Sequence, residues 1–510
     1  MGWHTVAAVR YADVNRAITA EGTAPSSFEQ SASDGSASTV GTFGSWRLTT
    51  GGAGKNLKLE IEVTGGSVSV VGQNPETRNI SDCAFDVSVE ADFIPQLANA
   101  SVRELRLSGG QAVEVGDSTP KNPTGAFLHT AALKQLLQDW LTLNIEEFNA
   151  VFATLNLDVE YENEGLSWLK PSHIGYAVAE PTVDPTEENC VFAVLCLIDG
   201  ETPPANISYQ VSDSAIPDGA VAAFLISPDK FIEHMIKPAL AHMFKDIAPA
   251  DADIYFEIDN DGRRIENIKQ VRLPDTKFPW GQLGKVESTK NPTLQPHKFS
   301  IEVDGTQLVI NAEEMHFDWG VDQWVDLFHE CRSQLELHDG TKMLTLTTEN
   351  QTGHGVVEAG WWRVTGEAVL MVVSALVGAF AGKTVKVAEA AAGGATTAAE
   401  VAGEETEAAE NAVATELAAS LANEAGAASG IGARFRGWLT TGLASVGGGT
   451  PLPIAHLIAS KKFGDEMMQI DPLISAAIDD TVSWPEAVGE YALASAQLND
   501  ALQFGLVHKQ

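Results

Sequence analysis

The stretch of this chain that comes nearest to a chemical motif is a glycine-rich turn ending in Gly54-Lys55. A phosphate-binding Walker loop needs Gly-x-x-x-x-Gly-Lys followed by Ser or Thr, placed between a strand and a helix whose N-terminus holds the phosphate. Here Thr49 stands at the first glycine position and Asn56 at the hydroxyl position. The residues that follow, Leu57–Val63, alternate apolar and charged side chains with the period of a half-buried strand. We therefore predict that the glycines turn the chain between two strands and bind no nucleotide.

Other residues that could carry out chemistry are isolated in the sequence. The Gly-x-Ser-x-Gly turn that presents the nucleophile of many esterases is missing. His329-Glu330 begins like a zinc-protease motif but lacks its second histidine, and His234 and His242 have no third ligand nearby. Two such histidines are more often packed or solvated than bound to a metal. We predict that the protein is not an enzyme and that it uses no cofactor and no metal.

The length of the chain indicates how many domains it forms, and its net charge excludes some partners. A chain of 510 residues is too long for one hydrophobic core and should form about two or three domains. With 44% hydrophobic and 20% charged residues, the composition is that of a globular protein. The net charge of −37 repels phosphate backbones, so we expect no nucleic-acid partner, and it also repels anionic bilayers.

The cysteines and the N-terminus indicate where the protein is made. The four cysteines show no Cys-x-x-Cys spacing and are too sparse to cross-link a chain of this size, which predicts buried, reduced thiols. The sequence opens without a basic segment followed by an apolar run, so we expect no secretory signal. We expect a protein that is cytoplasmic as synthesised and whose release would need lysis or dedicated machinery.

Helices are predicted at few places in the first half of the chain. Val6 to Ala20 reads as a short helix, followed by a Ser/Gly/Ala-rich linker from Glu21 to Thr42. A helix opening at Asn122 carries an apolar stripe at helical spacing, formed by Leu133, Leu136, Leu137, Trp140 and Leu141. A further helix begins at Ser227-Pro228-Asp229, which reads as a cap, a proline in the first turn and an acid near the positive helix end.

Hairpins account for much of the remaining sequence. The runs on either side of Asp259–Gly262 and of Asp304-Gly305 alternate in polarity, and Asp-Gly between such runs is a strong hairpin signal. The acidic turn at Asp259–Gly262 also suggests a calcium loop, but Ile268 stands where that loop needs its bidentate glutamate. Many strands and few long helices argue against a doubly wound parallel sheet.

The composition changes near residue 360. Ala368 to Gly382 contains no charged residue but is short for a membrane span, which needs about 17–25 apolar residues. Val387 to Gly432 is rich in Ala and Glu and favours helix, and Gly437 to Ser460 is again uncharged. The chain closes with Trp484 to Val507, which reads as a helix.

Several of these segments carry a family resemblance. The aromatic and glycine-rich hairpin of Phe43–Val63 resembles that of the forty-seven-kilodalton accessory protein and its OrfX relatives, which are encoded beside botulinum neurotoxins. Gly2–Val6 with Asp13–Ile18 resembles the start of that family, and Trp168–His173 running into Tyr176–Val178 resembles its central signature. Weaker similarities continue through Phe278–Trp280 and the hairpin at Asp304-Gly305, so that the resemblance spans roughly the first two-thirds of the chain.

The resemblance implies a tubular lipid-binding (TULIP) architecture. The expected fold is α+β, with elongated, strongly curved antiparallel sheets each wrapped around a long helix and an Ala-rich helical segment near the C-terminus. The expected division is an N-terminal TULIP-like module at 1–225, the start of a second module at 226–360, an Ala-rich helical insertion at 361–470 and a C-terminal helix at 471–510 that completes the second module.

The resemblance also implies a function. We expect a non-enzymatic, lipid-binding or lipid-interacting accessory protein of a bacterial toxin-like system, whose partners are a lipid or other hydrophobic ligand and proteins of the same gene cluster. Candidate lipid-lining residues lie on the helix after Ser227, where flexible thioethers can accommodate variable chains: Phe231, Met235, Leu240, Met243 and Phe244. Packing in an ordinary core is the other interpretation of these side chains.

The alternative function is a membrane-inserting or scaffold component that acts through residues 360–460. Two uncharged segments separated by an acidic arm resemble a helical hairpin that inserts once its glutamates are protonated. The candidate membrane-contact residues of this alternative are Trp361, Trp362, Leu370, Leu376 and Phe380. A long helical insertion packed on the main body explains the same composition.

Overall fold

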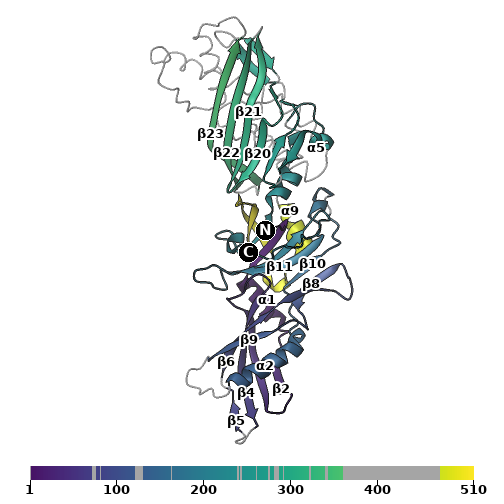
Figure 1. Cartoon of the computed structure of the whole chain (residues 1–510), viewed down its shortest axis with the longest axis vertical. Helices are drawn as coiled ribbons and strands as arrows, with labels where there is room; N and C mark the ends of the chain where they lie inside the picture. The colour runs from purple at the N-terminus through teal and green to yellow at the C-terminus, as the bar shows by residue number, and fades with distance from the viewer. Residues whose placement is uncertain are drawn as a thin grey trace.

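The computed structural model is an elongated molecule built mainly of antiparallel sheets (Figure 1). It describes residues 2–359, apart from 72–75, 81, 121–129, 162–163, 238–239, 242–243, 260, 274–275, 281–285, 291, 321–322 and 339–342, and residues 471–509. In the orientation of Figure 1 a lower, a central and an upper sheet follow one another along the long axis.

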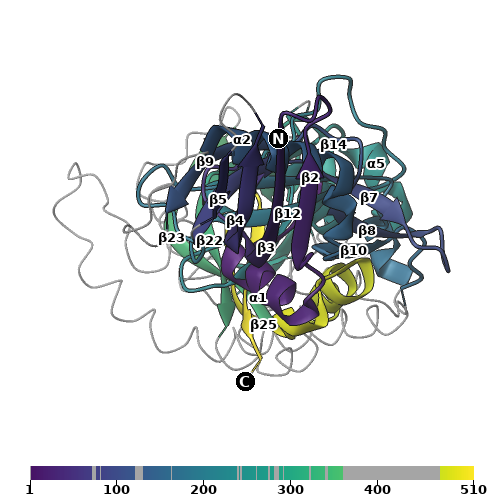
Figure 2. The same cartoon turned by 90° about the horizontal axis from the view of Figure 1, so that it is seen from below.

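The central sheet brings both ends of the chain together. Its strands, in spatial order, are β11 (His173–Ala179), β12 (Val191–Leu197), β1 (Thr5–Arg10), β13 (Ala222–Ile226), β26 (Leu502–His508) and β25 (Tyr491–Leu498). Neighbouring strands pair antiparallel. One face joins the main hydrophobic core, and residues 207–220, which include the short turn η3 (Asp213–Ala215), cover the other face. Helix α1 (Tyr11–Glu21) follows β1 and lies beside β25 (Figure 2).

The prediction of a helix from Val6 to Ala20 is wrong in its first half. β1 occupies Thr5–Arg10, and the helix begins only at Tyr11. β1 lies in the middle of the sheet, paired on one side with β12 and on the other with β13. A strand buried on both faces shows no alternation of apolar and polar residues, so a run such as Thr5–Arg10 carries no period that separates strand from helix.

The prediction of a C-terminal helix from Trp484 to Val507 is also wrong. After the short turn η9 (Glu486–Val488), strands β25 and β26 form a hairpin that pairs with β13. Asp500 takes a positive φ of 55° in the connecting turn. The alanines of β25 favour helix in isolation. However, the edge of β13 provides backbone hydrogen-bond partners for β26, and β26 provides them for β25. This tertiary pairing overrides a weak local propensity.

The lower sheet holds helix α2 (Thr130–Asn144) against one face. Its strands are β2 (Ser27–Ser31), β3 (Ala37–Leu48), β4 (Leu57–Val70), β6 (Cys83–Val89) and β9 (Glu114–Pro120), with β5 (Glu76–Asn79) paired to β4. The predicted stripe of α2 is buried, and its Trp140 packs 5.3 Å from Phe43 and 6.2 Å from Phe28, measured between ring centroids. The predicted turn between β3 and β4 is confirmed. The predicted linker Glu21–Thr42 is wrong, because β2 and much of β3 pair within it.

A smaller sheet flanks the central one. Its order is β24 (Val482–Ser483), β10 (Ala153–Asn156), β8 (Val102–Leu107) and β7 (Ala91–Pro95). Short helical segments complete this region: α9 (Asp471–Ser475), η8 (Ala476–Thr481), η1 (Ile145–Glu147) and η2 (Glu164–Leu169).

The upper sheet contains the longest strands. Its strands are β14 (Phe256–Ile258), β15 (Arg264–Asn267), β20 (Phe299–Asp304), β21 (Gln307–Gly320), β22 (Gln323–His338) and β23 (Met343–Ala359). Strand β19 (Thr293–Leu294) pairs with β21, and β16 (Val271–Arg272) pairs with β19. A separate hairpin is formed by β17 (Thr276–Trp280) and β18 (Val286–Lys290), and the short turns η5 (Pro249–Asp251) and α5 (Ala252–Tyr255) precede β14. Both predicted Asp-Gly hairpins are confirmed.

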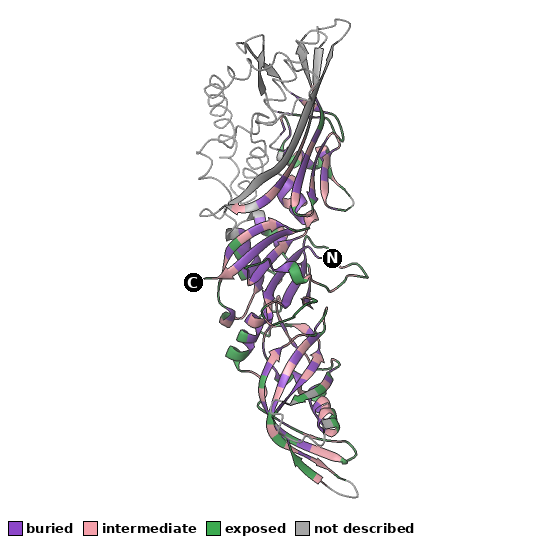
Figure 3. Ribbon diagram, turned by 90° about the vertical axis from the view of Figure 1, so that its left-hand side faces the viewer, coloured by how far each residue is buried: buried purple, intermediate pink, exposed green. Residues whose placement is uncertain are grey.

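One hydrophobic core continues through all three sheets. It includes Phe28 of the lower sheet, Phe192 of the central sheet and Ile301 of the upper sheet, and Figure 3 shows buried residues throughout the described length. The expected architecture of antiparallel sheets with few helices is confirmed. That each sheet wraps a long helix stays a prediction, and so does the division into four domains. The Ala-rich segment lies outside the described residues. No helix in the described part of the chain has the length and apolarity needed to cross a bilayer.

Candidate functional site

The helix predicted at Ser227 begins where the sequence indicates. α3 (Pro228–Phe231) continues into a π-helical turn, η4 (Ile232–Ile236), with Pro228 in the first turn. Ser227 occupies the predicted N-cap position, but its side chain makes no capping hydrogen bond. Instead, the backbone N–H of Ser227 donates to the carbonyl of His4 at 2.8 Å, which ties the start of the helix to the start of the central sheet.

Four of the five predicted lipid-lining residues lie together in the main core. Phe231, Met235 and Leu240 are buried there, and the ring of Phe244 lies 5.6 Å from Phe256 and 5.1 Å from Phe299. The fifth, Met243, lies outside the described residues. The predicted membrane-contact residues Trp361, Trp362, Leu370, Leu376 and Phe380 lie outside them as well.

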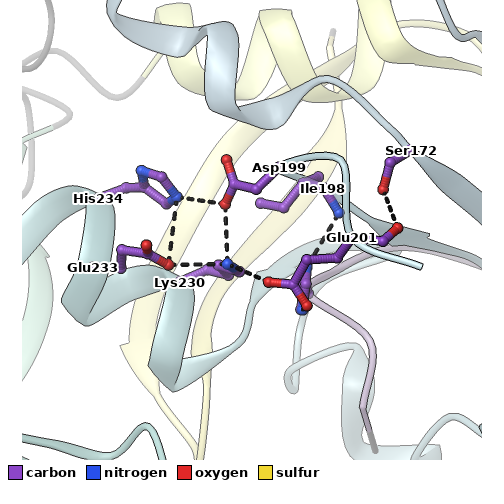
Figure 4. A network of polar contacts seen from close by, with 8 residues as sticks. Ser172, Ile198, Asp199, Glu201, Lys230, Glu233 and His234 are labelled. Carbon is purple, nitrogen blue, oxygen red and sulfur yellow. Dashed lines mark hydrogen bonds and ion pairs between the residues drawn. The ribbon is translucent and has the colours of Figure 1, made fainter. Parts of the chain in front are cut away.

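A polar cluster lies at the base of the same helix (Figure 4). The side chain of Lys230 is only 5% exposed, and its Nζ lies 3.0 Å from Asp199 Oδ2, 2.9 Å from Glu201 Oε1 and 2.9 Å from Glu233 Oε2. Asp199 and Glu201 follow β12, whereas Lys230 and Glu233 belong to the helix. We call these four residues, with His4 and His234, the Lys230 cluster. It joins the central sheet to the helix that packs on the upper sheet.

The charges in this cluster hold one another in their ionised forms. Burial works to lower the pKa of Lys230, but hydrogen bonds to Glu201, Glu233 and Asp199 outweigh it and raise that pKa well above 10.5. Burial likewise works to raise the pKa of Asp199, but hydrogen bonds from His234 and Lys230 hold it below 3.8. A lysine with a raised pKa contributes stability that is lost only above 10.5, and a carboxyl with a lowered pKa contributes stability that is lost only below 3.8. The Lys230–Asp199 ion pair is therefore constant across the neutral range.

Asp199, Glu233 and His234 are the described residues best placed to hold a metal, with ligand atoms within 4.8 Å of one another. However, the Lys230 ammonium already bonds the same two carboxylate oxygens. His234 Nε2 lies 2.7 Å from Asp199 Oδ2, and its ring stacks on Trp168 at 4.6 Å between centroids. The cluster therefore acts as an ion-pair network that carries its own cation, while His242 lies outside the described residues.

The glycine turn uses its backbone donors within the protein. Gly51 N–H donates to Glu180 Oε2 at 2.7 Å, and Gly54 exchanges two hydrogen bonds with Val178 of β11. The ammonium of Lys55 lies over the rings of Tyr176 and Tyr209, at 5.8 and 5.2 Å. The turn thus fastens the lower sheet to the edge of the central sheet, in keeping with the prediction that it links two strands.

The cavity between the central sheet and η8 is small. Its volume is about 10 Å³, and its lining includes Thr5, Cys196, Phe224 and Thr481. A space of this size accommodates about one water molecule. An acyl chain does not fit it.

The sequence did not predict the contacts between the two ends of the chain, and it did not predict the Lys230 cluster between the central sheet and the helix that packs on the upper sheet. Asp13 accepts hydrogen bonds from Tyr491 and His508, and Lys230 gathers residues from two distant segments. The one signal in the sequence is that Lys230 stands beside an apolar helix stripe. This position indicates a partly buried charge but does not identify the residues that pair with it.

Comparisons with known proteins agree on the family. Residues 1–403 match the sequence model described as "OrfX-like: Protein OrfX2/OrfX3/P47". The chain is 25% identical over 369 residues to Protein OrfX3 of Clostridium botulinum (strain Kyoto / Type A2), covering 66% of this chain and 74% of that protein. It is 24% identical over 282 residues to Protein OrfX3 of Paraclostridium bifermentans, covering 50% of this chain and 56% of that relative.

Solved structures show the same fold. P47 from Clostridium botulinum A2 superposes with a TM-score of 0.60 at 14% identity, covering 99% of this chain and 97% of that one. P47 of Clostridium botulinum E1 gives a TM-score of 0.59 at 14% identity, covering 100% and 99%. The match to the family model spans most of the chain, and the fold agrees over nearly its whole length. The chain therefore belongs to the OrfX-like family, the accessory proteins of clostridial toxin clusters that include OrfX2, OrfX3 and P47.

Proposed function

We propose that this protein is a non-enzymatic accessory protein of a toxin-like system that binds lipid or another hydrophobic ligand through the helix after Ser227. The observation that carries the proposal is the continuous apolar core. It runs from the lower to the upper sheet, and Phe231, Met235, Leu240 and Phe244 all contribute to it. Transfer of an acyl chain from water into an apolar interior contributes a favourable free energy of about 0.8 kcal/mol per buried methylene, so even a short chain gains binding free energy there.

Binding in this interior requires side chains to move apart. Met235 favours such movement, because an unbranched thioether adapts to irregular space at small cost. In the proposed tubular lipid-binding arrangement, the upper sheet and this helix together surround the bound ligand. The proposed protein partners are encoded in the same gene cluster, because a non-enzymatic accessory protein acts through the molecules that it binds.

Native mass spectrometry of the purified full-length protein tests the proposal, followed by extraction and identification of any bound lipid. We expect a stoichiometric lipid, and a ligand-free protein would contradict it. Leu240→Trp adds bulk among the candidate lining residues and should expel the lipid. Leu137→Trp is the matched control, because Leu137 is an equally buried leucine of the same core, but on α2 in the lower sheet.

The two variants give separate outcomes. Lipid lost from Leu240→Trp and retained by Leu137→Trp locates the ligand at the helix after Ser227. Equal retention or equal loss argues against that location, and thermal unfolding of both variants shows whether equal loss reflects general destabilisation.

A further inference from the structure

His4 makes a backbone contact with the start of the helix after Ser227, which follows β13 of the central sheet. It lies immediately before β1 and is buried, with 7% of its surface exposed. Its N–H donates to Cys196 O at 3.0 Å, and its carbonyl accepts from Ser227 N–H at 2.8 Å. Its ring nitrogen Nδ1 accepts from the backbone N–H of Ile198 at 3.1 Å. One residue thus joins β1, the end of β12 and the start of α3.

The geometry fixes which ring nitrogen of His4 carries the proton. Because Nδ1 accepts the N–H of Ile198, the neutral ring carries its proton on Nε2, which faces Glu201 Oε2 at 3.4 Å. A second proton has to bind at Nδ1, where the Ile198 N–H already points. Two donors then face each other and the hydrogen bond is lost, which leaves a buried amide without a partner.

The charges around His4 are of both signs. Glu201 and Asp199 approach it from the segment after β12, and Lys230 and Asp229 approach it from α3. Burial is the largest cause that lowers the pKa of His4, the Lys230 ammonium lowers it further, and the three carboxylates oppose this in part. The folded protein therefore favours neutral His4.

The helix held by His4 is also held by the upper sheet. The turn between β14 and β15 lies against α3, such that a methyl group added at Gly262 would come within 2.4 Å of the Asp229 Cβ. A second link is made by the turn between β25 and β26. There Asp500 N–H donates to Gly305 O at 2.9 Å, and Asp500 pairs with Arg263 at 2.7 Å. The Lys230 cluster and this turn are therefore two of the contacts between the central and upper sheets, beside the packing of β22 on β25.

We propose that His4 is the proton acceptor of an acid-sensitive joint, at which uptake of one proton at Nδ1 breaks the bond from Ile198 and loosens the helix after Ser227 from the central sheet. A histidine whose folded pKa is lowered contributes stability that is fully present above its ordinary pKa of 6.5 and is lost as the pH falls from there towards the folded pKa. The Lys230–Asp199 ion pair is constant in this range and does not contribute to the response. The inference does not depend on lipid binding.

Hydrogen exchange of the full-length protein, followed by mass spectrometry, measures the joint directly. After correction for the intrinsic rate, peptides that contain Ile198 and Ser227 should exchange about tenfold faster at about pH 5.5 than at about pH 7.5, as expected one unit below the ordinary histidine pKa. His4→Gln should lose this acid response, since a glutamine amide can accept from Ile198 and donate to Glu201 without titrating.

His297→Gln is the matched control. It removes an imidazole ring that pairs with Glu266 at the surface, where the His297 side chain is 61% exposed, and it should keep the full acid response of the wild type. A wild type whose two peptides show equal protection at both pH values would overturn the proposal. An acid response that persists in His4→Gln would do the same.

A measurement on the wild type keeps the proposal testable if His4→Gln does not fold. Nitrogen-15 NMR of histidine-labelled protein reports which ring nitrogen is protonated and at what pH it titrates. We expect an unprotonated Nδ1 at neutral pH and a pKa below 6.5 for His4. A proton on Nδ1 at neutral pH, or titration at or above 6.5, contradicts the inference.

Discussion

Asp13 and His508 lie close to opposite ends of the chain, yet Asp13 Oδ1 and His508 Nε2 are 3.1 Å apart. Tyr491 donates to the other carboxylate oxygen of Asp13, also at 3.1 Å, and its ring stacks on His508 at 5.2 Å. Arg16 completes the arrangement with an ion pair to Asp13 at 2.8 Å. The N-terminal helix α1 thereby fixes the C-terminal hairpin at the edge of the central sheet.

Replacing Asp13 should weaken that attachment. The Asp13 side chain is 3% exposed, so Asp13→Ala leaves the Tyr491 hydroxyl without its acceptor, removes the ion pair to Arg16 and should lower the free energy of unfolding by about 2–3 kcal/mol. Urea denaturation measures the change. Asp158→Ala, which removes an exposed carboxylate paired with Lys170, is the control and should unfold at the wild-type urea concentration. Equal effects in the two variants would show that Asp13 has no special role.

Replacing Lys230 by Met should destabilise the protein most at neutral pH. The variant leaves Asp199, Glu201 and Glu233 facing one another without their cation, at a cost of about 2 kcal/mol in the free energy of unfolding. As the pH falls from about 7 to about 4.5, protonation relieves this repulsion, and the gap to the wild type should narrow.

Unfolding of the Lys230→Met variant at both pH values measures that gap. Lys170→Met removes the same charge from an exposed ion pair and should leave stability unchanged at each pH. A Lys230→Met defect that stays constant with pH would contradict the picture of three facing carboxylates.

Two glycines in hairpin turns separate backbone strain from packing. Gly305 has a φ of 60° with open space around it, and Gly262 has a φ of 68° with the Cβ of Asp229 at 2.4 Å from an added methyl group. Gly305→Ala should cost only the strain of the left-handed backbone, about 1 kcal/mol. Gly262→Ala should cost clearly more in thermal unfolding, because it also pushes α3 away. A smaller cost at Gly262 would mean that this turn does not pack on α3.

The buried thiols should resist alkylation in the folded protein. Burial raises the pKa of Cys83 and of Cys190 to about 11, and that of Cys196 to about 12. Because the thiolate is the reactive form, iodoacetamide at about pH 8 should leave these three unmodified until urea is added. Peptide mapping identifies the modified residues, and rapid labelling of any of the three under native conditions would contradict their burial.

Local pattern was sufficient where one face of an element is polar. The alternation after Lys55 predicted β4, the stripe on α2 predicted its buried side, and Asp304-Gly305 predicted a hairpin. Each of these signals is short-range, since side-chain period and turn chemistry are written within about a dozen residues. The family resemblance was readable for the same reason, because its aromatic and glycine positions are local.

The tertiary structure alone decided the elements that are buried on both faces and the partners of the polar residues. Thr5–Arg10 became a strand because β12 and β13 flank it, and Tyr491–Leu498 became a strand because β13 had an open edge for its hairpin. Lys230, Asp199 and His4 come from three separate segments, and nothing in their spacing brings them together. Local sequence sets periods and turns, whereas the pairing of distant strands and the burial of a charge depend on which surfaces meet in space.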